Sequence, residues 1–395
     1  MPLSKIVAKS ITDDTITTDQ IADTSVHGRR NLIINGAMNH WQRGTTHTYT
    51  ANDSANYHTA DRWGHFLDFN DGSGSLSVTI SQSTDVPAGQ GFAYSLKGAT
   101  TPSSFAKSGS DNLALFTQKV ETYNAAALQW GTSGARKATL SYWIKSDTAG
   151  TGTLQIRLTD SSSVSGAADG NFYTKFTVNA ADTWEYKTHE IPANSTDGWR
   201  YTVSNTALHI HWYFGSNQSD VATEDAWFRS NNHGAPHSDN TYDFLNNAGE
   251  AFITGVQLEV GDKATPFEHR SFGEELALCQ RYAYMIGDPV NSGQRDIVNN
   301  GVAFGSTTGY IAIPFPCTMR AEPSLTVNDG SYFRLHSTSG GGLNTTAVSI
   351  DGGDTTERMA FINATTSGLT AGQGTLMVTS NSSDNGGTLL FSAEL

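Results

Sequence analysis

Cysteine is scarce in this sequence, which has only Cys279 and Cys317 among 395 residues. Two cysteines cannot form the disulfide framework of a small secreted fold, and no Cys-x-x-Cys pair or Cys/His cluster has the spacing of a zinc site. We therefore expect both thiols to be free and partly buried, and the sequence predicts no cofactor.

Long apolar runs and positive charge are also scarce. The N-terminal stretch MPLSKIVAKSITDD lacks the apolar core of a signal peptide, and no segment approaches the length of a membrane span. We therefore expect no insertion into a membrane and folding in a cytoplasm. The 24 basic residues against 38 acidic ones leave a net charge of −14. Because nucleic-acid binding needs a basic surface, this charge argues against such a partner.

Small polar residues are abundant instead. Glycine occurs 39 times, serine, threonine and asparagine are common, and aromatic residues make up 10% of the chain. The aromatic content argues against a disordered chain, and turn-forming residues between short apolar stretches are typical of all-β proteins. The length suggests two or three domains.

The first 30 residues carry an apolar side chain at every fifth position. These residues are Ile6, Ile11, Ile16, Ile21 and Val26. A period of five fits neither an α-helix nor a β-strand, so we expect an extended arm over residues 1–30. Such an arm cannot bury its apolar side chains alone, and we predict that it attaches the chain to another protein. The alternative is a flexible tail with accidental spacing.

Residues 31–272 are predicted to form a jelly-roll-like β-sandwich. Apolar and polar side chains alternate in residues 139–145 and 154–158, and turn residues fill the gaps. About ten strands joined in this way favour a sandwich. The candidate strands span residues 31–35, 76–81, 92–97, 113–120, 138–146, 153–159, 172–178, 184–191, 207–213 and 251–260. Residues 123–130 are a candidate short helix.

The end of this region is predicted to pass from a strand into a helix. Ile253, Val256 and Leu258 alternate with polar residues around Gly255, which favours a strand with a bulge at the glycine. Ser271 and Glu274 have the spacing of a capping box, so we expect a linking helix over residues 273–285.

Residues 286–395 are predicted to form a smaller C-terminal β-sandwich, the tip domain. Its candidate strands span residues 309–313, 324–328, 332–336, 347–350, 358–363, 374–379 and 388–393. Few large apolar residues are available for a core, so we expect the tip to need neighbouring chains for stability.

Several segments resemble tail-fibre and receptor-binding proteins of tailed bacteriophages. They are ITGVQLEVGDKATPFEHRSFGEELALCQRYAY at residues 253–284, Asn31-Leu-Ile-Ile-Asn-Gly-Ala-Met38, Trp41-Gln-Arg-Gly44 and Ala60-Asp-Arg-Trp63. In that family such segments open and close one β-sandwich similar to carbohydrate-binding modules. Leu389-Leu-Phe-Ser-Ala-Glu-Leu395 resembles the closing strand of fibre tip domains, which are usually trimeric. Similar Ile/Thr/Asp repeats begin many phage fibres.

This resemblance implies a virion protein that is assembled in the host cytoplasm. Its arm would bind other tail or particle proteins, its β domains would bind host-surface carbohydrate, and the chain would form a homotrimer. Two alternatives stay open: a structural adaptor or decoration protein without glycan binding, and a polysaccharide depolymerase. No pair of carboxylates and no long β-helix repeat stands out, so we expect no enzymatic activity.

A long loop over residues 215–249 is where we expect a ligand to bind. Sugars are bound by an aromatic face beneath the ring and by polar side chains around its hydroxyls. The loop carries this mixture in Trp227, Arg229, Asn231, His233, His237, Asp239 and Tyr242. The alternative is a polar loop whose aromatic residues attach it to the sheet.

The remaining tryptophans and the metal candidates give weaker signals. We expect Trp41, Trp63, Trp143, Trp184 and Trp212 to pack in the core, and Trp130, Trp199 and Trp227 to lie nearer turns. Asp68-Phe-Asn-Asp-Gly72 misses the spacing of a calcium loop, and the pair His209 and His211 lacks a third ligand. The resemblance leaves a structural calcium open, because sandwiches similar to carbohydrate-binding modules often hold one.

Overall fold

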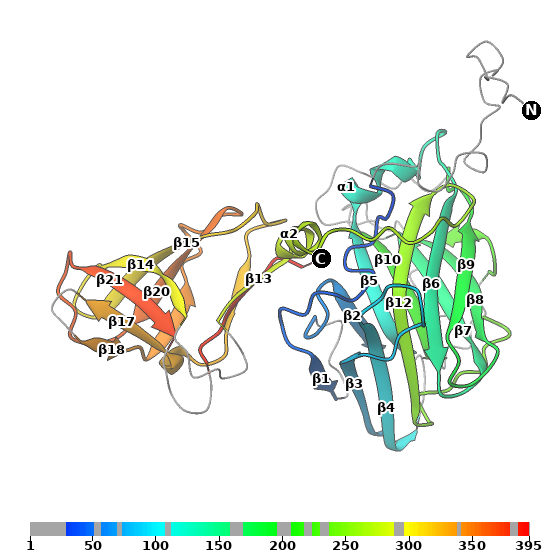
Figure 1. Ribbon diagram of the computed structural model, residues 1–395, viewed down its shortest axis with the longest axis horizontal. Coiled ribbons are helices and arrows are strands. Elements are labelled where there is room, and N and C mark those ends of the chain that lie inside the picture. Colours follow the sequence, from blue (N-terminus) through cyan, green and yellow to red (C-terminus); the bar gives the residue numbers. More distant parts are fainter. Residues whose placement is uncertain are drawn as a thin grey trace, which may run out of the picture.

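The computed structural model describes residues 29–50, 57–68, 73–106, 112–158, 169–195, 207–216, 223–229, 237–287, 296–337, 341–379 and 386–394. The five residues predicted to attach the arm, Ile6, Ile11, Ile16, Ile21 and Val26, lie outside these ranges. The described chain is almost entirely β-structure, which confirms the predicted all-β class (Figure 1). No helix in the described ranges is long and apolar enough to cross a membrane.

Two six-stranded antiparallel sheets form the larger β body. The first sheet has the order β1 (Thr46–Tyr49), β3 (Ser73–Ser83), β4 (Ser95–Ala106), β12 (Gly249–Val260), β6 (Ala138–Ser146) and β9 (Glu185–Ile191). The second sheet has the order β11 (Trp227–Arg229), β8 (Gly170–Val178), β7 (Gly150–Leu158), β10 (Ala207–Ser216), β5 (Asn112–Glu121) and β2 (Trp63–Asp68). Apolar side chains from both sheets form one core between them, so the body is a β-sandwich.

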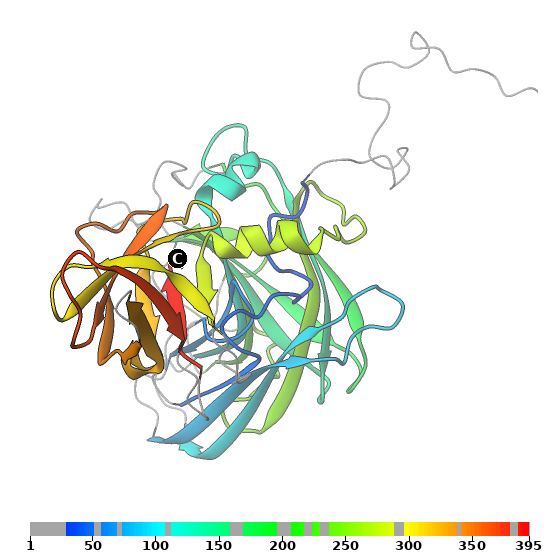
Figure 2. The same ribbon diagram turned by 60° about the vertical axis from the view of Figure 1, so that its left-hand side comes forward.

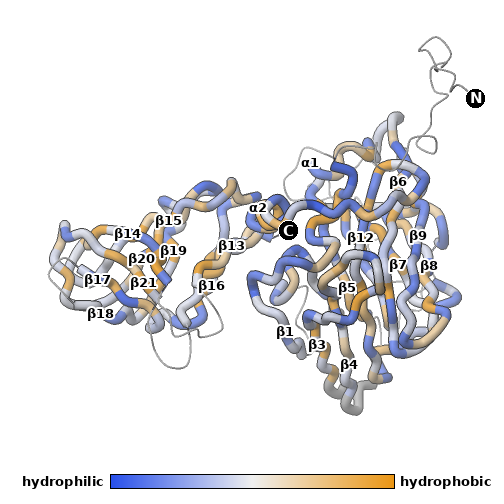
Figure 3. The backbone as a smooth tube through the Cα atoms, in the orientation of Figure 1, coloured by the Kyte–Doolittle hydropathy of each residue, from blue (hydrophilic) through white to orange (hydrophobic). Residues whose placement is uncertain are grey.

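The alternation of side chains explains which residues form this core. Apolar and polar residues are interspersed along the strands (Figure 3). In β6, Leu140, Tyr142 and Ile144 are fully buried, whereas Trp143 between them is not. Every predicted strand of this region except residues 31–35 overlaps an observed one, and α1 (Thr122–Ala125) with η3 (Ala126–Leu128) confirms the short helix.

Strand β12 contains the predicted bulge. The pairing of β12 with β6 shifts register between Thr254 and Gln257, and Gly255 between them has φ +62°. A side chain at Gly255 would also meet a neighbour, because a Cβ there would lie 2.5 Å from Cζ of Phe92. Both observations show why the bulge uses glycine.

The prediction of a strand over residues 31–35 is wrong. These residues instead lie beside the bulged part of β12 and are held there partly through side chains. Asn31 Nδ2 donates to the Val256 carbonyl at 3.0 Å, and Asn31 Oδ1 accepts from the Leu258 N–H at 3.1 Å. Asn35 then turns the chain with φ +58°. Here asparagine side chains make hydrogen bonds that the backbone of a strand would make. Such bonds leave no alternation of apolar and polar residues in the sequence by which they could be recognised.

Two further sheets form the smaller β body. One has the order β13 (Ala283–Ile286), β22 (Leu389–Ser392) and β16 (Ser324–Val327). The other has the order β18 (Gly342–Asn344), β17 (Phe333–Ser337), β21 (Gly374–Thr379), β14 (Ile297–Ala303), β15 (Thr308–Pro314), β20 (Met359–Thr365) and β19 (Ala347–Ile350), with η4 (Gly330–Tyr332) before β17. One core, which includes Phe391 from the first of these sheets and Phe333 from the second, joins them.

The helix predicted over residues 273–285 is shorter than expected. Helix α2 (Phe272–Gln280) begins at the predicted cap, where Ser271 Oγ accepts from the Glu274 N–H at 3.4 Å. It ends before residue 283, because residues 283–286 pair with β22 as strand β13. Figure 2 shows α2 beside the segment that follows residue 29, and the Asn35 N–H donates to Glu275 Oε1 at 2.5 Å.

Buried charges join the two β bodies near α2. Glu394 Oε1 accepts from Arg43 Nη2 at 2.9 Å, and its other oxygen pairs with Arg62. The Arg62 guanidinium also lies 3.6 Å from the centre of the Tyr282 ring. The Tyr282 hydroxyl in turn donates to Glu121 at 2.7 Å. Arg43 and Arg62 belong to the motifs quoted above, so these motifs build the junction of the two bodies.

The two cysteines lie near this junction and are free, as predicted. Cys279 is fully buried and Cys317 is partly exposed. Burial raises the pKa of both thiols, so neither is activated as a nucleophile.

Candidate functional site

The described residues of the predicted ligand loop mostly serve packing. Trp227 Nε1 donates to the Pro192 carbonyl at 2.8 Å, and its ring packs edge-on against Trp130 at 5.2 Å between centroids. Tyr242 is 4% exposed, and its hydroxyl donates to the Thr148 carbonyl at 2.9 Å. Burial raises the pKa of Tyr242 to about 12. Tyr242 therefore has no face open to a sugar, whereas Trp227 is only half-buried.

The polar residues of that loop pair with one another or with the sheet. His237 is buried, and its Nε2 lies 3.2 Å from Glu224 Oε2. Asp239 forms an ion pair with Lys175, and its N–H donates to His237 Nδ1 at 3.1 Å. Arg229 is exposed at the end of β11. The other two predicted residues, Asn231 and His233, lie outside the described ranges, so a ligand site over the whole loop stays a prediction.

A groove lies elsewhere, on the outer face of the first sheet. Trp143 of β6 and Tyr186 of β9 are register partners, and their ring centroids are 5.3 Å apart at an angle of 46°. Tyr186 is 44% exposed. Because neighbouring strands place register partners on the same face, the two rings form one aromatic surface that solvent reaches.

Three further rings form the opposite wall of the groove. Phe92, Phe267 and His269 are mutual neighbours, with centroid distances of 4.9 to 5.4 Å. The bulge at Gly255 lies beneath Phe92, so the irregularity of β12 shapes this wall. The groove has a volume of about 520 Å³, which is enough for a small ligand.

The lining of the groove is polar in places but carries no fixed charge. Gln90, Ser141, Thr265 and His269 supply hydrogen-bonding groups. Among the described residues that line it there is no Asp, Glu, Lys or Arg. Acid–base cleavage of a glycosidic bond needs two carboxylates, which this lining lacks.

A second aromatic cluster continues along the same face. The Lys145 ammonium lies 4.4 Å from the centre of the Phe252 ring, and Trp184 Nε1 donates to Asp85 Oδ1 at 2.9 Å. Burial alone would raise the pKa of Asp85, but hydrogen bonds from Lys145 and Trp184 hold it below its ordinary value. The Lys145 ammonium and the Asp85 carboxylate form an ion pair with each other.

The structure corrects several predictions about tryptophan. Trp63 and Trp212 are buried in the core as expected, but Trp143 and Trp184 lie on the outer face of the sheet. Trp130 lies in a turn, as expected, and is also fully buried. The alternation of residue types along a strand shows that neighbouring side chains point to opposite faces of the sheet. It does not show which of the two faces points toward the core.

The histidine pair on β10 does not form a described metal site. The rings of His209 and His211 are 5.6 Å apart, and His211 Nδ1 lies 3.0 Å from Thr117 Oγ1. In the part of the chain that the structure describes, no group of three or more His, Cys, Asp or Glu could hold a metal ion. Residues 69–72 of the candidate calcium segment lie outside that part.

No family model and no curated protein matches the chain. Solved structures give weak similarity. A tailspike protein 4 domain of bacteriophage CBA120, described as enzymatically active, is 12% identical with a TM-score of 0.29; the match covers 58% of this chain and 21% of that chain. A family 11 carbohydrate-binding module from Clostridium thermocellum, in complex with a β-1,3-1,4-mixed-linked tetrasaccharide, is 11% identical with a TM-score of 0.27, over 56% and 98%. A xylan-binding domain from Paenibacillus barcinonensis is 14% identical with a TM-score of 0.27, over 54% and 98%.

Proposed function

We propose that this protein is a tail-fibre protein of a tailed bacteriophage that binds a glycan on the host surface without cleaving it. The observation that supports glycan binding is the groove on the outer face of the first sheet, with the exposed Tyr186 and the half-buried Trp143 on one wall. Aromatic faces pack against the C–H side of a pyranose ring, and neutral hydrogen-bonding groups such as Gln90 and Ser141 suit its hydroxyls.

The role in the virion rests on the sequence motifs. In this proposal residues 1–30 attach the chain to another particle protein, residues 31–272 form the glycan-binding domain and residues 286–395 form the tip. Three copies would present three grooves. Linked weak sites gain affinity without new contacts, so one groove of modest affinity is sufficient.

The groove can be tested with the variant Trp143→Ala on an array of bacterial surface polysaccharides. We expect the wild type to retain a subset of them and the variant to lose at least about tenfold in affinity, which corresponds to about 1.4 kcal/mol. Tyr123→Ala is the matched control, because Tyr123 is 57% exposed on α1 and does not line the groove.

The unfolding midpoint of each variant shows whether it has folded. If no polysaccharide is retained by the correctly folded wild type, the structural alternative of an adaptor or decoration protein gains support. Release of reducing ends from a retained polysaccharide would instead support a depolymerase.

A further inference from the structure

A second pocket lies directly beside the groove. It has a volume of about 390 Å³, and residues 259–263 at the end of β12 form one of its walls. Thr265 lines both this pocket and the groove, so the two hollows meet at that residue. The two hollows are therefore close enough to contact two parts of one extended ligand.

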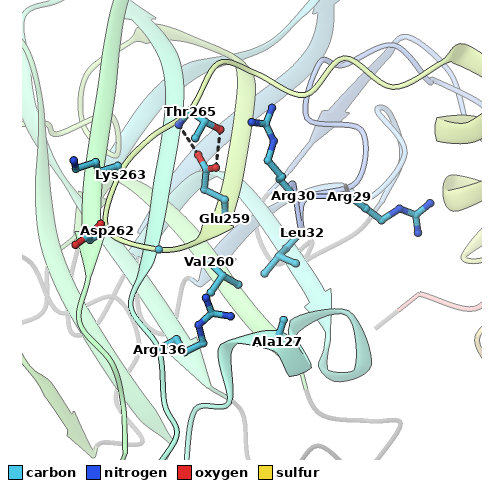
Figure 4. A pocket seen from close by; sticks show the side chains of 11 residues that line it. Arg29, Arg30, Leu32, Ala127, Arg136, Glu259, Val260, Asp262, Lys263 and Thr265 are labelled. Carbon is cyan, nitrogen blue, oxygen red and sulfur yellow. Dashed lines mark hydrogen bonds between the residues drawn. The ribbon is translucent and has the colours of Figure 1, made fainter. Parts of the chain in front are cut away.

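The pocket combines an apolar floor with basic side chains. Leu32, Ala127 and Val260 form the floor, and Arg136 and Arg30 lie on opposite sides of it (Figure 4). Lys263 and Arg29 also line the pocket, although Arg29 points outward and pairs with Glu274 at 3.1 Å. This gathering of cations is notable in a chain with a net charge of −14.

Two of the arginines retain unused donors. Arg30 Nη2 donates to the Pro266 carbonyl at 3.2 Å, but the buried Nη1 has no hydrogen-bond partner. Arg136 is exposed, and within the described ranges no carboxylate forms an ion pair with it. Guanidinium groups bind carboxylates and phosphates through paired hydrogen bonds, so the accessible donors of Arg136 suit an anion.

The basic side chains of the pocket outnumber its carboxylates. Glu259 is 4% exposed, and its two oxygens accept from the Thr265 N–H at 2.8 Å and from Thr265 Oγ1 at 2.7 Å (Figure 4). Glu259 Oε1 also accepts from Gln257 Nε2 at 3.0 Å. This carboxylate is therefore committed to holding the wall of the pocket. Asp262 is the other acidic residue of the lining, against four basic ones.

We propose that this pocket binds an anionic group, a carboxylate or a phosphate, of the glycan whose uncharged part lies in the groove. The ligand class is then an acidic polysaccharide. This inference rests on the proposed function, because it assigns the second part of the same ligand.

The test is the variant Arg136→Gln, compared with the wild type on the same array of bacterial polysaccharides. We expect the retained polysaccharides to carry uronic acids or phosphate, and the variant to bind them roughly tenfold more weakly, because a charge-assisted hydrogen bond is lost. Lys137→Gln is the matched control. It removes the same charge one residue away, where the side chain pairs with Glu190 at 2.5 Å and does not line the pocket.

Chemical treatment of the best-retained polysaccharide identifies the anion. Reduction of its carboxyl groups to alcohols should weaken binding if the anion is a uronic acid, and removal of phosphate should do so if it is a phosphate. Each effective treatment should weaken the binding of Arg136→Gln less than that of the wild type. If neutral polysaccharides bind the wild type as tightly, or if Arg136→Gln binds like the wild type, the inference is wrong while glycan binding stands. If Trp143→Ala also has no effect, the proposed groove fails as well.

Discussion

Tyr142 and Trp143 show how one step along a strand changes the surroundings of a side chain. Tyr142 is fully buried between the sheets, and its hydroxyl lies 2.9 Å from His189 Nε2. Burial raises the pKa of Tyr142, so the hydroxyl stays protonated. Trp143 points to the opposite face and lines the groove. Packing fixes the first residue, and the second is free to contact a ligand.

His189 should make the stability of the sandwich depend on pH. Burial, together with the charge of Lys187, lowers the pKa of His189 to about 4. In the unfolded chain this histidine binds a proton near pH 6.5, whereas in the folded protein it stays neutral down to about pH 4. The folded state therefore keeps its full stability above pH 6.5 and loses stability as the pH falls toward 4. We expect the free energy of unfolding to decrease by on the order of 2 kcal/mol over this interval.

Urea unfolding between pH 7 and pH 4.5 measures this slope. The variant His189→Gln should be less sensitive to pH over the same range, whereas Tyr123→Ala, which changes an exposed ring without a proton to bind in this range, should keep the wild-type slope. Equal slopes in all three proteins would contradict the assignment to His189.

At the scale of elements, the bulge in β12 connects backbone geometry to the groove. A side chain at Gly255 would meet both an unfavourable φ and the ring of Phe92. We expect Gly255→Ala to lower the free energy of unfolding by about 2 kcal/mol or more and to weaken glycan binding, because Phe92 forms a wall of the groove.

The variant Gly372→Ala separates the cost of the unfavourable φ from the cost of the contact with Phe92. Urea unfolding of both variants measures the two costs. Gly372 has φ +82°, but a Cβ there would meet nothing within 4 Å. This control should therefore cost only about 1 kcal/mol, and glycan binding should be unchanged. A cost for Gly255→Ala no larger than that of the control would show that contact with Phe92 is unimportant.

The sequence predicted elements more reliably than it predicted the groove. Strands such as β6 and β12 alternate clearly, and the cap at Ser271 and the bulge at Gly255 have local signals. Short strands such as β1 and β13 were missed, because they are defined by pairing with β3 and β22 and not by their own pattern. The groove was missed for a related reason. Its aromatic walls come from β6, β9 and two loops, and no local pattern brings these together.

At the scale of the whole molecule, the smaller β body carries exposed apolar residues that suit contact with further copies. Val302 is 44% exposed and Phe304 is 70% exposed, and the Phe304 ring stacks on Tyr310 at 4.8 Å. Val302 and Phe304 are two residues apart at the C-terminal end of β14. Neighbouring exposed apolar side chains of this kind suit a contact with another chain.

We expect the protein to be a homotrimer and the double variant Val302→Ser with Phe304→Ser to dissociate it. Size-exclusion chromatography with light scattering measures the mass of each species. Tyr123→Ser, which removes an exposed aromatic from the larger body, should stay trimeric. A monomeric wild type would argue against the trimer, and a trimeric double variant would place its interface elsewhere.

The junction between the two bodies determines where the last described residues lie. Strand β22 runs antiparallel to β13, and Glu394 returns to Arg43 and Arg62 beside α2 (Figure 1). A gold label attached after Glu394 would therefore lie near the middle of the molecule in electron micrographs, well away from the strands at the far end of each β body (Figure 1). A pulling force applied to the outermost strands of the smaller β body would be shared by β13 and β22. Both strands lead to the junction beside α2, where Glu394 pairs with Arg43 and Arg62.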